Sequence, residues 1–367
     1  MRSILKFTSL LFASAVMFLS CEKTGDDAGL DAGFQIASDK NVIQSNGSDV
    51  AVFTATLDGK DVTAETVFYL KETMTPLEGN KLTADKDGVY NVIGMYGTFY
   101  TEEPVSVTAI NVAVPAAAAD PDAAKTSFVH RAFLNQYTGT GCGYCPGMIR
   151  ALRAAFADEE TKNMAVHAAI HNYNAGDPAA ITFPKPSAGW PYLEIDMAVS
   201  FSYDLDPEAK KGVLKTALSE RVSAPAKVGI SANPVLVDDL LVVTVEVKAA
   251  EDGEYNLGVW FLQDNVYGQQ TDYLGIADNS YNYHENCVRK ADSRSGNTYA
   301  GYPLGEIKAG TTAQRTFVLN IEKEDWKLKD MNDLHFAAFV TAKNGKFYQV
   351  VNVVDCEISE PTPYEYK

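Results

Sequence analysis

The chain has 367 residues, of which 46% are hydrophobic and 22% charged, and its formal net charge at pH 7 is −17. That length allows two or three domains with a core each, and the composition is that of an ordinary globular protein. The negative charge argues against nucleic acid as a partner and against adsorption to anionic lipid through a basic patch.

The N-terminus has the features of a bacterial lipoprotein leader. Arg2 and Lys6 precede an apolar run, residues 9–19, which is too short to cross a bilayer as a helix. The run ends at Cys21, in a context that resembles a lipobox, whose cysteine is lipidated and becomes the first mature residue. We therefore expect residues 1–20 to be a signal peptide and a lipid on Cys21 to anchor the protein. The alternative is that Cys21 is an incidental thiol in the leader.

The stretch after Cys21 is small and acidic. Residues 21–33 are expected to form a tether, and the acidic residues within 22–27 look like the export signal of surface lipoproteins in Bacteroidetes. The expected location is thus the outer membrane, with the protein at the cell surface.

Residues 34–113 carry short apolar runs that predict β-strands. The run Asp87-Gly88-Val89-Tyr90 resembles the turn and tyrosine of immunoglobulin-like sandwiches. Because this segment contains neither Cys nor His, we expect an immunoglobulin-like β-domain that acts as a spacer. Residues 114–125 are rich in alanine and contain two prolines, which predicts a linker.

A dithiol follows the next strand. Residues 129–137 read as a strand, Cys142-Gly143-Tyr144-Cys145 comes after a glycine-containing loop, and the apolar spacing from Met148 to Phe156 predicts a helix. Residues 164–171 read as a buried strand, so the order is strand, dithiol, helix, strand.

A cysteine at a helix N-terminus has its thiolate stabilised by free backbone N–H groups. We therefore assign Cys142 as the nucleophile and Cys145 as the resolving thiol in thiol–disulfide exchange with protein or peptide substrates. Gly143 would leave room for a partner chain. Two alternatives are a permanent structural disulfide and half of a zinc site, although zinc needs about four ligands and no second paired-cysteine motif exists.

Gly189-Trp190-Pro191 precedes another apolar strand. Together with the dithiol, this motif makes residues 126–224 resemble a thioredoxin-like domain, with Pro191 in the place of the family's cis-proline. The resemblance implies that Gly143, Tyr144, Trp190 and Pro191 bind substrate. Gly141 stands where that family usually has a tryptophan.

His167 and His171 lie four apart on a predicted strand and share a face. We expect core or surface roles rather than metal binding. His171 falls at the same sheet edge as the dithiol, so it is the candidate to influence the proton of Cys142. Residues 172–187 should overhang that edge as a lid or rim.

Residues 225–358 again carry strand patterns, with a hairpin signal at 343–346, and predict a β-sandwich followed by a tail at 359–367. Segment 264–311 holds six tyrosines among Asn, Gly and Ser, a composition that suits an adaptable binding surface and equally a packed loop. Cys287 and Cys356 are either a pair or two separate thiols.

The predicted fold class is therefore a three-domain chain, with an N-terminal immunoglobulin-like β-domain, a central thioredoxin-like α/β domain and a C-terminal β-sandwich. The whole arrangement resembles the twenty-eight-kilodalton outer-membrane lipoprotein family of Bacteroidetes. Two functions fit: a thiol–disulfide oxidoreductase or isomerase at the cell envelope, and a non-enzymatic surface binding protein or adhesin. We expect no cofactor, no metal and no nucleic acid. The oligomeric state is left open.

Overall fold

The computed structural model describes residues 33–201, 207–294 and 298–367. The predicted signal peptide, the lipidation site Cys21 and residues 21–32 of the tether lie outside the described residues. Two α-helices are described, α1 (Cys145–Phe156) and α2 (Pro207–Val222). Neither of them is long and apolar enough to cross a membrane.

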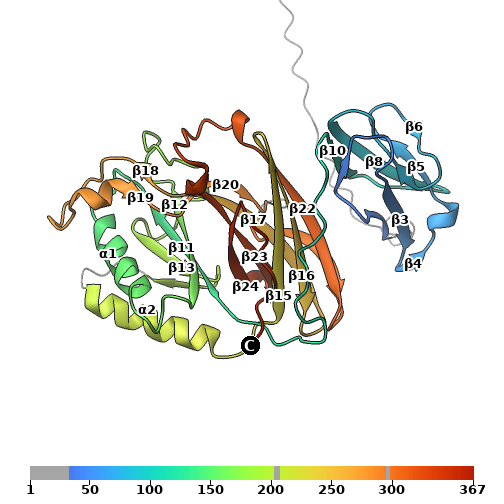
Figure 1. Cartoon of the computed structure of the whole chain (residues 1–367). Coiled ribbons are helices and arrows are strands. Elements are labelled where there is room, and N and C mark those ends of the chain that lie inside the picture. Colours follow the sequence, from blue (N-terminus) through green and yellow to red (C-terminus); the bar gives the residue numbers. More distant parts are fainter. Residues whose placement is uncertain (1–32, 202–206, 295–297) are drawn as a thin grey trace, which may run out of the picture.

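The N-terminal unit consists of two β-sheets around one apolar core (Figure 1). The first sheet holds β1 (Phe34–Ser38), β3 (Ala51–Leu57), β4 (Lys60–Asp61) and β7 (Lys81–Leu82). The second holds β2 (Val42–Gln44), β5 (Val67–Leu70), β6 (Thr75–Pro76), β8 (Gly88–Tyr96), β9 (Phe99–Tyr100) and β10 (Val105–Ile110). Side chains from both sheets, including Phe53, Phe68 and Val107, are fully buried between them.

The larger body is built on one nine-stranded sheet. Its order is β14 (Val199–Phe201), β13 (Tyr192–Ile195), β11 (Ala132–Thr138), β12 (Ala165–His171), β20 (Cys287–Asp292), β17 (Gly253–Gln263), β23 (Leu334–Asn344) and β24 (Phe347–Glu357), and β21 (Tyr302–Ile307) also pairs with β17. A three-stranded sheet holds β15 (Val228–Val237), β16 (Leu240–Ala249) and β22 (Thr312–Asn320). The strands β18 (Val266–Tyr267) and β19 (Tyr283–His284) form a separate two-stranded sheet near α1 (Figure 1). Short 3-10 turns occur at Thr63–Glu65, Asn279–Asn282, Ile321–Lys323 and Met331–Asp333.

The predicted fold class, with a thioredoxin-like α/β domain at its centre, is wrong. The structure is mostly β-sheet, and β11 to β14 are not a separate α/β domain, because β12 pairs in parallel with β20 at Ala169 and Cys287 and so joins the C-terminal strands. The apolar pattern of a strand shows that it is buried but not which strand it pairs with. The central and C-terminal strands belong to one sheet that is buried on both faces.

Helices and a second sheet share one face of the nine-stranded sheet. The helices α1 and α2 bury Leu152 and Leu218 against Leu134 of β11. Further along that face, β15, β16 and β22 form a sandwich with β17, β23 and β24 around buried side chains such as Phe261 and Phe336. Figure 1 shows the helices at one end of the body and the sandwich at the other.

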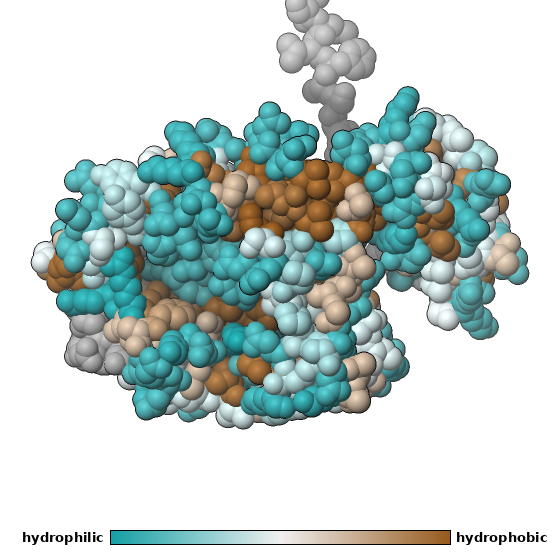
Figure 2. All heavy atoms as spheres, viewed as in Figure 1, coloured by the Kyte–Doolittle hydropathy of each residue, from teal (hydrophilic) through white to brown (hydrophobic). Residues whose placement is uncertain are grey.

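The opposite face buries Phe133, Trp260 and Phe339, and the chain between β12 and β13 packs on it through Phe183. The predicted lid therefore covers core side chains. On the side of the molecule shown in Figure 2, hydrophobic residues gather beside the N-terminal unit, and much of the remaining visible surface is hydrophilic.

The N-terminal unit contacts the sandwich. The Asn41 side chain donates to the Thr316 carbonyl at 2.7 Å and accepts from the Thr316 amide at 3.0 Å. Val42 and Ile110 pack against Val242 of β16. The domain boundaries stay predictions.

Candidate functional site

Cys142 and Cys145 form a disulfide at the start of α1. Cys145 is the first residue of the helix, and its amide donates to the Cys142 carbonyl at 3.1 Å. The side chain of Cys142 is 3% exposed and that of Cys145 is fully buried. Cys142 is thus the more exposed of the two cysteines, although it is also buried.

Residues after β12 hold the dithiol loop on one side. The carboxylate of Asp177 accepts from the Thr140 amide at 2.6 Å, and Asn174 Oδ1 accepts from the Gly141 amide at 3.0 Å. A Cβ at Gly141 would lie 2.9 Å from Asn174 Oδ1. A side chain at this position would therefore displace the Asn174 amide from the loop.

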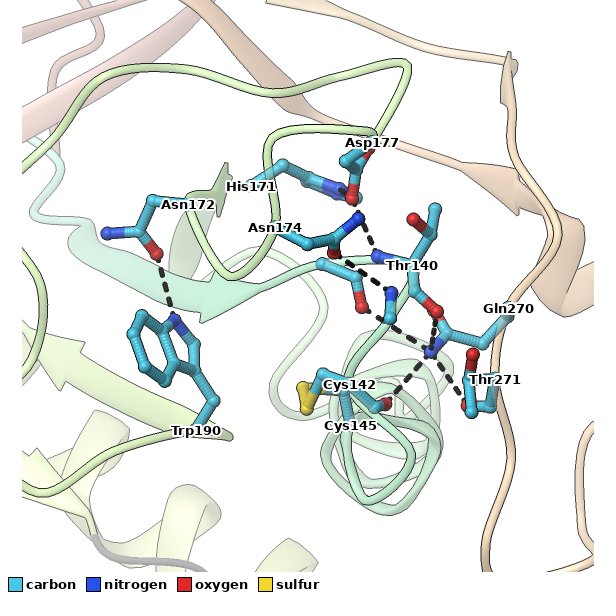
Figure 3. The surroundings of a disulfide bond; sticks show 12 residues. Thr140, Cys142, Cys145, His171, Asn172, Asn174, Asp177, Trp190, Gln270 and Thr271 are labelled. Atoms are coloured by element: carbon cyan, nitrogen blue, oxygen red, sulfur yellow. Dashed lines mark hydrogen bonds and ion pairs between the residues drawn. A yellow bond between two sulfur atoms is a disulfide. The ribbon is translucent and has the colours of Figure 1, made fainter.

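Residues 268–273, from the C-terminal half of the chain, hold the loop on the other side. Gln270 Nε2 lies 3.0 Å from the Cys142 carbonyl, and the Thr271 amide donates to the Thr140 carbonyl at 2.8 Å (Figure 3). The Tyr273 amide donates to the Gly143 carbonyl at 2.8 Å. The loop is therefore fixed by backbone pairing with a distant segment.

The space that Gly143 was predicted to leave for a partner is filled by Tyr273. A Cβ at Gly143 would lie 2.4 Å from the Tyr273 ring. That ring is 69% exposed and packs edge-on to Tyr144, which is 47% exposed. Two exposed tyrosines thus cap this side of the dithiol.

Trp190, followed by Pro191, lies on another side of the dithiol loop (Figure 3). The peptide bond between them is cis, and Pro191 is buried. Trp190 Nε1 donates to Asn172 Oδ1 at 2.9 Å, and its ring meets Tyr173 edge-on. In Figure 3 the cysteine sulfur lies on the Trp190 side of the loop, away from Gln270 and Thr271. A partner would therefore approach the disulfide from the Trp190 side.

The structure places His171 against Cys287. His171 Nδ1 lies 2.9 Å from Asp177 Oδ2, and His171 Nε2 lies 3.6 Å from Cys287 Sγ. Burial alone would raise the pKa of Asp177, but the hydrogen bond and charge of His171 and the amides of Thr140 and Ala179 outweigh it, and the pKa is lowered. His171 reaches the dithiol loop through Asp177, which bonds both His171 and Thr140.

Cys287 and Cys356 are both free and buried, so they do not pair with each other. Burial holds the pKa of the Cys287 thiol well above its ordinary value. Cys287 therefore stays a protonated thiol and is not a reactive thiolate. Among the described residues, no group of three or more His, Cys, Asp and Glu side chains is arranged to hold a metal ion.

The tyrosine-rich segment 264–311 divides into two parts. Tyr267, Tyr273 and Tyr283 are largely exposed, whereas Tyr281 is buried and Tyr299 packs on Phe183. One part can thus meet a partner, and the other covers the core.

Reasoning from the sequence did not find the residues that fix the dithiol loop, namely Asn174, Asp177, Gln270 and Tyr273. Asp177 had a weak signal, because it follows His171 by six residues in a proline-flanked loop. Gln270 had none, since it is 128 residues from Cys142 along the chain.

Comparisons with known proteins bear on the C-terminal half of the chain. No curated protein matches this chain. Residues 188–361 match the family model described as outer membrane protein Omp28, a range that includes Trp190, Pro191 and Gln270 but neither Cys142 nor Cys145.

Two solved structures from Porphyromonas gingivalis are similar to this chain. HBP35 is 18% identical, with a TM-score of 0.49, over 65% of this chain and 78% of that one. A domain of the outer membrane lipoprotein Omp28 is also 18% identical, with a TM-score of 0.24, over 36% of this chain and 88% of that one.

Proposed function

We propose that this chain is an envelope protein whose Cys142–Cys145 disulfide oxidises thiols of protein or peptide partners. The match of residues 188–361 to the Omp28 outer membrane protein family supports the envelope location. The family match confirms the predicted outer-membrane localisation. Anchoring by a lipid on Cys21 stays a prediction.

The observation that carries this proposal is a disulfide whose second cysteine opens α1. The positive end of a helix dipole stabilises a thiolate formed beside it. No acidic residue lies in the first turn of α1 to oppose that field. The N-terminal end of α1 therefore favours release of a cysteine thiolate.

The exchange balances without any other oxidant. A partner thiolate attacks Cys142 Sγ, a mixed disulfide forms, and Cys145 leaves as a thiolate. A second partner thiolate then attacks the partner sulfur of that mixed disulfide, and Cys142 leaves as a thiolate. The partner has lost two electrons and gained a disulfide, and this chain holds the dithiol.

The test is to trap the mixed disulfide in the full-length protein. We expect reduced Cys145→Ser to form reductant-sensitive adducts with an oxidised, disulfide-bearing model peptide, because the resolving thiol is missing. Adducts would be detected by mass spectrometry and mapped to Cys142. The matched control is Cys142→Ser/Cys145→Ser, which keeps Cys287 and Cys356.

A permanent structural disulfide predicts the opposite result. In that case the wild-type disulfide stays intact in the presence of a dithiol peptide, and Cys145→Ser forms no more adducts than the double variant. Either finding would end the proposal.

A second candidate is a surface binding protein that recognises its ligand through segment 264–311. The exposed rings of Tyr267, Tyr273 and Tyr283 favour it. This candidate predicts ligand capture that survives Cys142→Ser/Cys145→Ser and is lost on replacing these tyrosines by serine.

A further inference from the structure

A cavity of about 200 Å³ lies between α1 and the sheet strands β11 and β12. Leu152 and Phe156 of α1 form an apolar wall, and Gln136, Thr138 and His167 belong to the wall made by the sheet. Residues from Tyr281 to Asn286 close the third side. The cavity is independent of the exchange reaction proposed for the disulfide.

Two polar atoms of this cavity wall, one on Gln136 and one on Thr138, lack hydrogen-bond partners. Gln136 and Thr138 are each 2% exposed, and neither Gln136 Nε2 nor Thr138 Oγ1 has a partner in the part of the chain that the structure describes. Buried donors without partners are rare in folded proteins and cost free energy unless a ligand or water satisfies them.

The hydrogen bonds of His167 determine which atoms of the Gln136 amide are free to bind a ligand. Asn286 Nδ2 lies 3.3 Å from His167 Nδ1 and donates to it, so the ring carries its proton on Nε2. His167 Nε2 lies 3.0 Å from Gln136 Oε1 and donates to that oxygen. The amide N–H groups of Gln136 are therefore left as unused donors.

The cavity wall is nearly neutral. Burial lowers the pKa of His167 and of His284, which also lines the cavity, to about 4, so both rings are uncharged at neutral pH. Arg153 supplies a positive charge on the wall and bonds Ser280, and Glu285 supplies a carboxyl group whose pKa is raised, mainly by burial. The free groups are neutral donors, and they call for an acceptor on the ligand.

The size of the cavity selects a small organic molecule. One buried water needs roughly 10–15 Å³ of such space, and an apolar cavity of about 150 Å³ holds benzene. From the size, the apolar wall and the unused donors together, we propose that this cavity binds a small molecule with an apolar body and a carbonyl or carboxylate oxygen. The body packs on Leu152 and Phe156, and the oxygen accepts from Gln136 Nε2 and Thr138 Oγ1.

Three probes of one shape test this proposal on the full-length protein: benzamide, benzoate and benzene. We expect benzamide or benzoate to bind at least about 10-fold more tightly than benzene, measured by saturation-transfer NMR and calorimetry, because only these two carry an acceptor oxygen. Preference for benzoate would identify an anionic ligand class, and preference for benzamide a neutral one. Equal binding of benzene overturns the proposal, because the oxygen would then contribute nothing. No binding of the two oxygen-bearing probes up to ~10 mM also overturns it and leaves water as the occupant.

Variants separate ligand binding from a structural role. Gln136→Leu keeps the side-chain volume and removes the donor, so the oxygen-bearing probe should lose about 10-fold in affinity while benzene is unaffected. Ala169→Leu, which fills the cavity from its sheet wall, should abolish binding of all three probes.

The matched control is Gln263→Leu, because Gln263 is also buried with a partnerless oxygen but does not line the cavity. It should leave every affinity unchanged. If Gln136→Leu fails to fold, Thr138→Val gives the same test. Unchanged affinity in a folded Gln136→Leu or Thr138→Val variant contradicts the proposed oxygen contact.

Discussion

The two ends of the nine-stranded sheet are covered in different ways. Around β17, β23 and β24 the core is apolar, and Phe261 and Phe336 are fully buried against the second sheet. Around β11 and β12, buried Gln136, Thr138 and His171 lie beneath or beside α1. We call the first the dry end, for its apolar core, and the second the polar end. Buried atoms without partners occur at both ends, including Gln263 at the dry end, but only those of Gln136 and Thr138 at the polar end line the cavity described above. Binding and exchange chemistry are therefore expected at the polar end.

Removing a large side chain from the dry end should have the largest effect on stability. We expect Phe336→Ala to lower the free energy of unfolding by about 3–5 kcal/mol, because it leaves a cavity in a closely packed core. Urea unfolding followed by tryptophan fluorescence measures the change. Phe347→Ala, at a side chain that is 77% exposed, is the control and should stay within about 0.5 kcal/mol.

The same variant tests whether the two ends form one cooperative unit. Since β11 and β23 belong to one sheet, hydrogen exchange should accelerate in β11 as well as in β23. Unchanged protection of β11 would mean that the two ends open independently.

Acid should act on the polar end. Burial lowers the pKa of both His167 and His284 to about 4, whereas an unfolded histidine titrates near 6.5. Below that pH the unfolded chain takes up protons that the folded chain excludes, so stability falls as the pH drops from 6.5 toward 4. We expect a loss of about 2–4 kcal/mol by pH 4.5.

The measurement is the pH dependence of unfolding for the wild type and for His167→Gln/His284→Gln. The double variant should have a flatter acid limb, because its side chains do not titrate. Parallel acid limbs in the two proteins would show that other groups control acid sensitivity.

Alkali should act at the dry end, with a smaller effect. His335 on β23 lies 2.7 Å from Asp355 and 3.6 Å from Asp264. Burial would lower its pKa, but the hydrogen bonds and charges of these two carboxylates raise it to about 10. The stabilisation is complete below about pH 6.5 and is lost as the pH rises toward 10.

We expect that loss to be about 1–3 kcal/mol, because Asp355 is half exposed and solvent screens the pair. His335→Gln should remove the decline between pH 7 and 10 in the same unfolding measurement. An alkaline limb as steep as that of the wild type would assign the decline to another group.

Local patterns predicted the elements around the dithiol well. The helix expected from the apolar spacing is α1, and the strand expected at residues 164–171 is β12. The hairpin signal at residues 343–346 lies between β23 and β24, with Gly345 at a φ of 63°. These features depend on neighbours in the sequence, so the sequence contains the information.

The partnership between distant strands could not be predicted. The central strands join the C-terminal ones through a single residue pair, Ala169 with Cys287. A pairing of one residue on each strand leaves no pattern in the sequence of either segment. The assignment of the central segment to an α/β domain was therefore wrong.

By itself the sequence determined the dithiol at the start of a helix and the β-rich C-terminal half, because helix starts and strands are encoded by adjacent residues. Only the tertiary structure decided that Cys287 lies beside His171, that Tyr273 covers Gly143, and that Gln136 and Thr138 line a cavity without partners. Such contacts join residues far apart in the chain, and they exist only once the sheet has brought its two ends together.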